Sequence, residues 1–171
     1  TTPPRDIKDG TDAAAVFGIL GETVGRRLRK YGMKSALIQI SIRDCDLAVF
    51  QHQQKLKRPT NSTVEITALA RELFSQKYDW QRPVRSLGIC AAALTGEDTS
   101  EQLSIYDDER RRIKREKIDR AADELCMRFG KRTVTYGTSL VSPGLISKSV
   151  NNPVVLPYTE ATVNREGGKN V

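Results

Sequence analysis

The sequence predicts an α+β fold in which an antiparallel sheet carries two helices on one of its faces. Along the chain, the apolar period changes in the order helix, strand, strand, helix, strand. The first seven residues fit the end of one more strand, which completes the order β-α-β-β-α-β. The length of 171 residues suits one well-buried domain with extensions.

The first helix is expected over about residues 12–31. Residues 9–12 supply capping side chains, and Gly32 ends the helix. Between them, apolar side chains recur at four- and three-residue steps, namely Val16, Leu20, Val24, Leu28 and Tyr31. This spacing places them on one face of an amphipathic helix.

Two strands are expected next, joined by a turn at residues 43–46. Ile38, Ile40 and Ile42 alternate with polar residues, which is typical of a strand with one buried and one open face. The second strand runs from Leu47 to about Leu56, and the stretch 51–58 is polar and basic. We therefore expect the open face to meet solvent or a ligand.

A second helix and a third strand complete the domain. Pro59 and Thr60 are expected to end the second strand, and residues 62–65 match a capping box that starts a helix ending near Tyr78. The third strand spans residues 84–94. Its apolar alternation slips between Val84 and Leu87, which predicts a bulge that turns Arg85 outward.

Three further segments are expected beyond this domain. Residues 96–107 form a polar linker around a short apolar peptide, residues 108–130 a highly charged helix, and residues 131–171 an irregular tail. The helix carries a narrow apolar stripe of Ile118, Ala122, Leu125 and Phe129. Its basic residues 110–117 fit contact with DNA and a solvated helix equally well.

Composition indicates the environment and the class of partner. The net charge of +7 and the pI near 9.5 favour a polyanionic partner, with nucleic acid ahead of lipid, although solubility alone is the alternative. No apolar run is long enough to span a membrane. The three cysteines show neither metal nor disulfide spacing, which favours a reducing cytoplasm.

The sequence shows no catalytic or metal-binding residues. It lacks a phosphate-binding glycine motif, and the glycines of the first helix are explained by close backbone packing. His52 and Cys45 lie on opposite sides of a hairpin turn without an orienting group, so a nucleophilic pair is disfavoured. We expect no cofactor in this chain.

The open sheet face and its rims are the candidate nucleic-acid interface. Backbone binding requires dispersed basic and hydrogen-bonding side chains rather than one constellation, and few aromatic residues lie here, which favours duplex over single strands. A solvated face is the alternative. The candidate residues are Ser41, Arg43, Gln51, Gln53, Lys55, Lys57, Arg58, Thr60, Arg82 and Arg85.

The chain resembles the C-terminal little finger domain of bacterial Y-family DNA polymerases, the lesion-bypass group that includes DNA polymerase IV and the catalytic subunit of DNA polymerase V. The resemblance covers about residues 1–94 and continues into the extension to residue 130. It rests on the ordered segments TPPRDI (2–7), VGRRLR (24–29), QISIRD (39–44), LKRPT (56–60), ARELF (70–74) and PVRSLGI (83–89).

The resemblance implies that residues 1–95 form a little finger domain, with its first strand truncated, that grips template-primer duplex. It adds Thr2 to the DNA-binding residues. The parent protein would be a nucleotidyltransferase in translesion synthesis and DNA repair. Its palm, fingers and thumb would bind two Mg²⁺, so this chain, which looks like an excised piece, would be inactive alone.

The apolar peptide at residues 102–106 resembles a bacterial sliding-clamp-binding peptide, which implies the clamp as a second partner. Gln102 would anchor by hydrogen bonds, Leu103, Ile105 and Tyr106 would fill an apolar pocket, and Ser104 lies between them. A short edge strand packed on the domain is the alternative.

Two other functions remain open on the residues alone. An unrelated α+β RNA-binding module would prefer single-stranded RNA and would depend on an exposed aromatic residue. A pure protein-interaction domain would show no salt-dependent binding of nucleic acid at all.

Overall fold

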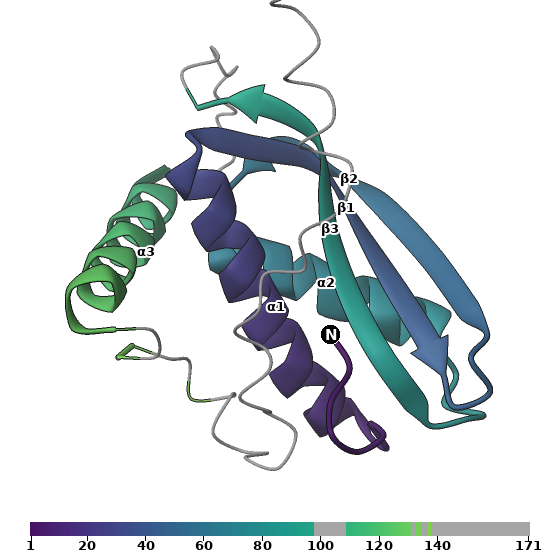
Figure 1. Ribbon diagram of the computed structural model, residues 1–171. Helices are drawn as coiled ribbons and strands as arrows, with labels where there is room; N and C mark the ends of the chain where they lie inside the picture. The colour runs from purple at the N-terminus through teal and green to yellow at the C-terminus, as the bar shows by residue number, and fades with distance from the viewer. Residues whose placement is uncertain (98–108, 131–132, 135–136, 138–171) are drawn as a thin grey trace, which may run out of the picture.

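The computed structural model describes residues 1–97, 109–130, 133–134 and 137. Over these ranges the chain forms three helices and three strands (Figure 1). In chain order they are α1 (Gly10–Lys30), β1 (Met33–Asp44), β2 (Val49–Thr60), α2 (Thr63–Lys77), β3 (Val84–Gly96) and α3 (Glu109–Phe129). The expected linker and apolar peptide from residue 98 to 107, and nearly all of the expected tail, lie outside the described residues.

The sheet is antiparallel and has the order β2-β1-β3, with β1 in the centre. Both α1 and α2 lie against the same face of this sheet (Figure 1). The N-terminal segment runs along the outer edge of β3, where Ile7 and Val84 exchange two backbone hydrogen bonds of 2.8 and 2.9 Å. The expected first strand is thus a single bridge in the described residues, and the predicted α+β class is confirmed.

The core lies between the sheet and the two helices. Ile38, Ile40 and Ile42 on β1 are fully buried, as their alternation predicts. Phe17 of α1 and Phe74 of α2 meet above them with ring centroids 5.4 Å apart in an edge-to-face arrangement. This packing leaves the opposite face of the sheet uncovered by α1 and α2.

The predicted bulge in β3 is confirmed. Arg43 of β1 pairs with Ser86 and Asp44 pairs with Val84, so Arg85 is the extra residue on β3. A glycine also ends α1 as expected, because Gly32 adopts a φ value of +60° there, and Gly130 follows α3 with a φ value of +104°.

The predicted end of β2 is wrong, because the strand continues through Pro59 to Thr60. The β1–β2 register shifts between Ser35, which pairs with Thr60, and Leu37, which pairs with Lys55. This irregularity on an edge strand accommodates proline, which has no N–H to donate to the ladder.

The predicted capping box of α2 is also wrong. Ser62 occupies the N-cap position, but its side chain makes no capping hydrogen bond. The Thr63 N–H instead donates to the carboxylate of Asp119 on α3, at 3.0 Å. A tertiary contact therefore replaces the local cap.

The apolar stripe predicted for α3 is present but is only partly buried. Ile118, Leu125 and Phe129 are 55%, 41% and 64% exposed, whereas Cys126 is buried. No helix among the described residues is long and apolar enough to cross a membrane.

Candidate nucleic-acid interface

The open face of the sheet brings together the central residues of the predicted site. Gln39 pairs across the strands with Gln53, and Ser41 pairs with Gln51. The Gln39 side-chain amide donates to the Gln51 side-chain oxygen at 3.0 Å, which orders two of these polar groups. Because directly paired residues share a face, these four side chains form one polar row opposite the buried isoleucines.

Basic side chains lie at both ends of this polar row. Arg43 is exposed where β1 ends, and Lys55 is exposed on β2 opposite Leu37. Lys57 is also exposed, but it follows the register shift of β2, so the strand alternation does not fix its face. The described sheet therefore presents dispersed cations around hydrogen-bonding groups, which suits contact with a phosphate backbone.

Gly88 of β3 also belongs to this surface, because its missing side chain leaves space for a neighbouring residue. Gly88 pairs with Ser41. A Cβ atom at Gly88 would lie 2.3 Å from the Ser41 hydroxyl oxygen. A glycine here leaves space for the serine side chain, and sequence reasoning assigned Gly88 no role in the site.

Two residues of the predicted site are not brought to the exposed face. Thr60 is buried, and its hydroxyl oxygen accepts a hydrogen bond from the Ser62 N–H at 3.1 Å. Arg58 is only partly exposed and is already engaged in interactions within the protein. Their contact with DNA stays a prediction.

The two predicted arginines of β3 and its preceding loop already have carboxylate partners. Arg82 pairs with Asp46 in the β1–β2 turn and lies 3.9 Å from Asp44. Arg85 lies 3.2 Å from Asp6 and 3.4 Å from the Pro3 carbonyl, in the segment that also holds the exposed Thr2. These partners offset part of the positive charge at this edge of the sheet.

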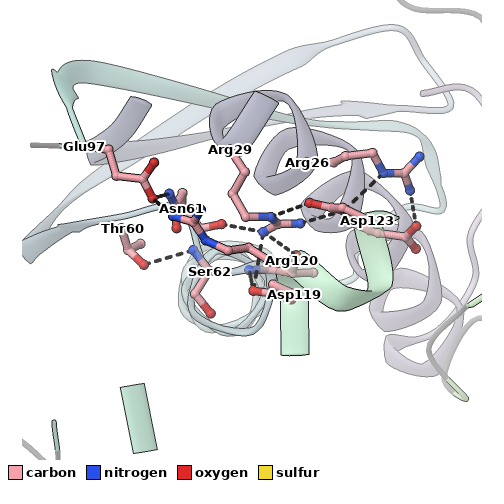
Figure 2. A network of polar contacts seen from close by, with 11 residues as sticks. Arg26, Arg29, Thr60, Asn61, Ser62, Glu97, Asp119, Arg120 and Asp123 are labelled. Carbon is pink, nitrogen blue, oxygen red and sulfur yellow. Dashed lines mark hydrogen bonds and ion pairs between the residues drawn. The ribbon is translucent and has the colours of Figure 1, made fainter. Parts of the chain in front are cut away.

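A second polar cluster, which sequence reasoning missed, surrounds Arg29 at the C-terminal end of α1 (Figure 2). The Arg29 side chain is 7% exposed. Its Nε and Nη2 groups donate to the two Asp123 carboxylate oxygens at 2.6 and 3.1 Å, and its Nη1 donates to the Asn61 carbonyl at 2.7 Å. Asp119 lies 3.3 Å from the same Nη1.

These contacts attach α3 to the ends of α1 and α2. Asp119 bridges Arg29 and the first N–H of α2, and Arg120 of α3 pairs with Glu97 just after β3 (Figure 2). The bidentate Arg29–Asp123 pair fixes the orientation as well as the distance of the two helices. We call the group formed by Arg29, Asn61, Asp119 and Asp123 the Arg29 cluster.

Glu22 lies one turn before Arg26 on α1 and borders the Arg29 cluster. It pairs with Arg26, which also lies 3.6 Å from Asp123. Burial raises the pKa of the Glu22 carboxyl, the neighbouring Asp123 carboxylate adds to this rise, and Arg26 and Arg29 oppose it.

The predicted clamp-binding residues Gln102, Leu103, Ser104, Ile105 and Tyr106 lie outside the described residues, so their role stays a prediction. Within the described ranges, no three His, Cys, Asp or Glu side chains are grouped so that they could hold a metal ion. Cys45 lies in the β1–β2 turn and His52 on β2 opposite Ile40.

Comparison with known proteins identifies the family. Residues 1–105 match the model of the impB/mucB/samB family C-terminal domain. A DNA polymerase IV of Acetivibrio thermocellus is 36% identical over 144 residues, which cover 84% of this chain and 36% of that protein. DNA polymerase IV 2 of Bacillus subtilis is 31% identical over 147 residues, covering 84% of this chain and 34% of that protein.

The chain thus spans about a third of the length of these curated relatives. A solved structure described as a complex of the beta-clamp processivity factor and the little finger domain of PolIV aligns with a TM-score of 0.47 and 20% identity. It covers 63% of this chain and 95% of that one. Because the family model covers more than half of its residues, the chain belongs to the impB/mucB/samB family and carries its C-terminal domain, the little finger domain of Y-family DNA polymerases.

Proposed function

We propose that this chain is the DNA-binding and clamp-tethering part of a Y-family DNA polymerase that acts in translesion synthesis and DNA repair. The observation that carries the proposal is the match of residues 1–105 to the C-terminal domain of this family. Lesion bypass and polymerase activity are proposed for a longer parent protein, because this chain spans about a third of the length of its curated relatives.

The open face of the sheet would hold template-primer duplex through its phosphate backbone. Arg43 and Lys55 would supply charge, and the ordered Gln39–Gln51 pair would supply hydrogen bonds that fix the register. Arg82 and Arg85 would contribute less, because binding a phosphate requires them to share or leave Asp46 and Asp6. Such contacts tolerate any base sequence.

The peptide at residues 102–106 would bind the sliding clamp. A tether of this kind raises the effective concentration of the enzyme at the primer end, so processivity increases without any new contact to DNA. Leu103 and Tyr106 would supply the apolar anchors and Gln102 the hydrogen bonds.

The two Mg²⁺ ions of nucleotidyl transfer would be bound by a polymerase core outside this chain. The described residues here do not fit such a site, since they contain no suitable group of three metal-ligating side chains. This chain would bind DNA in the cytoplasm and synthesise nothing alone.

The test of the DNA face is fluorescence anisotropy with a primer-template duplex across a salt series. A variant with Arg43, Lys55 and Lys57 changed to alanine should bind more weakly. Its slope of log affinity against log salt should be shallower by about 0.9 for each phosphate that the variant no longer neutralises. The matched control changes the exposed Lys8, Arg71 and Lys77 to alanine, which removes the same charge at positions outside the three strands.

Equal binding by the sheet-face and control variants would overturn the DNA-face assignment. Preferential binding of single-stranded RNA in a parallel titration would instead favour the RNA-binding alternative. For the clamp, a Leu103→Ala and Tyr106→Ala variant should lose binding to an immobilised bacterial sliding clamp while it keeps its duplex affinity. Unchanged clamp binding would remove the tether from the proposal.

A further inference from the structure

We propose that the outer face of α3 is a second binding surface for the phosphodiester backbone of nucleic acid, separate from the open face of the sheet. The proposal starts from the distribution of charge around this helix. Asp119 and Asp123 both point toward the domain, where they contact Arg29. Glu116 is engaged by Arg112 one turn earlier on α3.

This arrangement leaves the side of α3 that faces away from the domain rich in cations. Arg110, Lys114 and Lys117 are exposed and recur at i, i+4 and i+7, so they share one face of the helix. Arg128 follows eighteen residues after Arg110, which is five full turns, and lies on the same face. Glu124 is the exposed acid on this face of the described helix.

The cations of this face form no ion pair with a described carboxylate. They differ in this respect from Arg115 and Arg120 on the same helix, which pair with Glu65 at 3.7 Å and with Glu97. Arg110, Lys114 and Lys117 span about 10 Å along the helix axis at 1.5 Å per residue. A row of cations on this scale can follow a stretch of sugar-phosphate backbone.

The Arg29 cluster holds this row in place. Bidentate contact between Arg29 and Asp123, together with the Asp119 cap on α2, fixes α3 against the helical layer. The cations are thereby presented by a rigid element rather than by a free segment, which lowers the entropy lost on binding. Phe129 is 64% exposed at the end of the same helix, and the Arg128 guanidinium lies over its ring, 5.4 Å from the centroid, so this end of the helix combines a cation with an aromatic surface.

The α3 surface is distinct from the sheet face. In Figure 1, α3 lies beside α1 at the end of the helical layer, whereas the open face is on the opposite side of the sheet. The two surfaces share no residue, so their contributions to binding can be separated by substitution. The inference therefore does not depend on the proposed role of the sheet.

The test compares three triple-alanine variants of the full chain by fluorescence anisotropy. The α3 variant changes Arg110, Lys114 and Lys117, and the sheet-face and control variants are those given above. Each is titrated with a blunt DNA duplex and with a single-stranded oligonucleotide of equal length across a salt series. Alanine preserves helix propensity, and circular dichroism checks that α3 is retained.

We expect the α3 variant to bind at least one of the two probes about tenfold more weakly than the control at low salt, with a shallower salt slope. The probe that is affected identifies whether paired or unpaired DNA is the source of the phosphates. Binding of both probes equal to that of the control would overturn the inference. If only the sheet-face variant binds DNA more weakly than the control, this inference is wrong and the sheet-face proposal stands. If only the α3 variant binds more weakly, the sheet-face proposal is wrong and this inference stands.

Discussion

The helices that cover the sheet and the helix that follows it are held to the domain by different forces. Phe17 of α1 and Ile66 of α2 are fully buried against the strands. α3 is attached by the ion pairs of Arg29 and Arg120, while its Ile118 and Leu125 stay 55% and 41% exposed. One region is stabilised by apolar burial and the other by directional polar contacts.

This difference indicates how each region should respond to change. Apolar burial is non-directional and sums over many contacts, so the layer of α1 and α2 should unfold only with the whole domain. The attachment of α3 depends on a few charged groups with defined geometry, and removal of one partner leaves another charge buried without compensation. α3 should therefore be able to separate from a domain that remains folded.

The largest effect is expected from truncation in the apolar layer. Phe17→Ala removes a fully buried ring that packs on Phe74 and should lower the free energy of unfolding by about 3–5 kcal/mol. Urea denaturation followed by circular dichroism measures this loss. Met127→Ala on α3, at an 81% exposed position, is the control and should have little effect. A comparable loss in both variants would contradict the comparison.

A smaller and more local effect is expected in the polar region. Arg29→Met should weaken the attachment of α3 by about 1–3 kcal/mol, because Asp119 and Asp123 lose their contacts with Arg29. The loss is limited because Asp119 keeps the Thr63 N–H and Asp123 keeps Arg26 at 3.6 Å. In hydrogen exchange, the amides of α3 should lose protection while those of β1 keep theirs. Equal loss of protection in both would show that the two regions unfold together.

A double substitution sharpens this prediction. Combining Arg29→Met with Asp123→Met removes both charges, so the loss of stability should be smaller than the sum of the two single losses. Simple additivity would indicate that the contact contributes little.

The apolar region was also the part that the sequence predicts well. The alternation of Ile38, Ile40 and Ile42 identifies the buried face of β1, and with it the polar row that starts at Gln39. The slip before Leu87 locates the bulge at Arg85. Such patterns are local in sequence, because the period of a strand reports directly which face is buried.

The polar region was predicted less well because its partners are distant in sequence. Asp119 caps α2 through Thr63, which lies 56 residues earlier, and replaces the local cap expected from Ser62. Arg85 finds Asp6 across 79 residues. A charged side chain shows no periodicity that indicates which opposite charge it meets, so neither the Arg29 cluster nor the pairing of Arg85 could be derived from spacing.

The smallest expected effect is a pH dependence of stability that arises from Glu22, beside the Arg29 cluster. Burial raises the pKa of Glu22 above its ordinary value of 4.5, so the folded chain binds its proton more tightly than the unfolded chain does. The contribution of Glu22 to stability is therefore present at acidic pH and is lost as pH rises through the raised pKa. Glu22→Gln cannot titrate and lacks this loss.

Urea denaturation of the wild type and of Glu22→Gln across a pH series tests this sign. The stability of the wild type relative to the variant should fall as pH rises from the acidic range toward neutrality. The control is Glu72→Gln, at an exposed position of α2, which should not show this trend. The opposite trend would mean that attraction to Arg26 outweighs burial in setting the charge of Glu22. Because Glu22 borders the Arg29 cluster, a confirmed trend would place a pH-dependent group beside the attachment of α3. The apolar layer has no such group at its core, because the side chains of Phe17, Phe74 and Ile66 do not titrate.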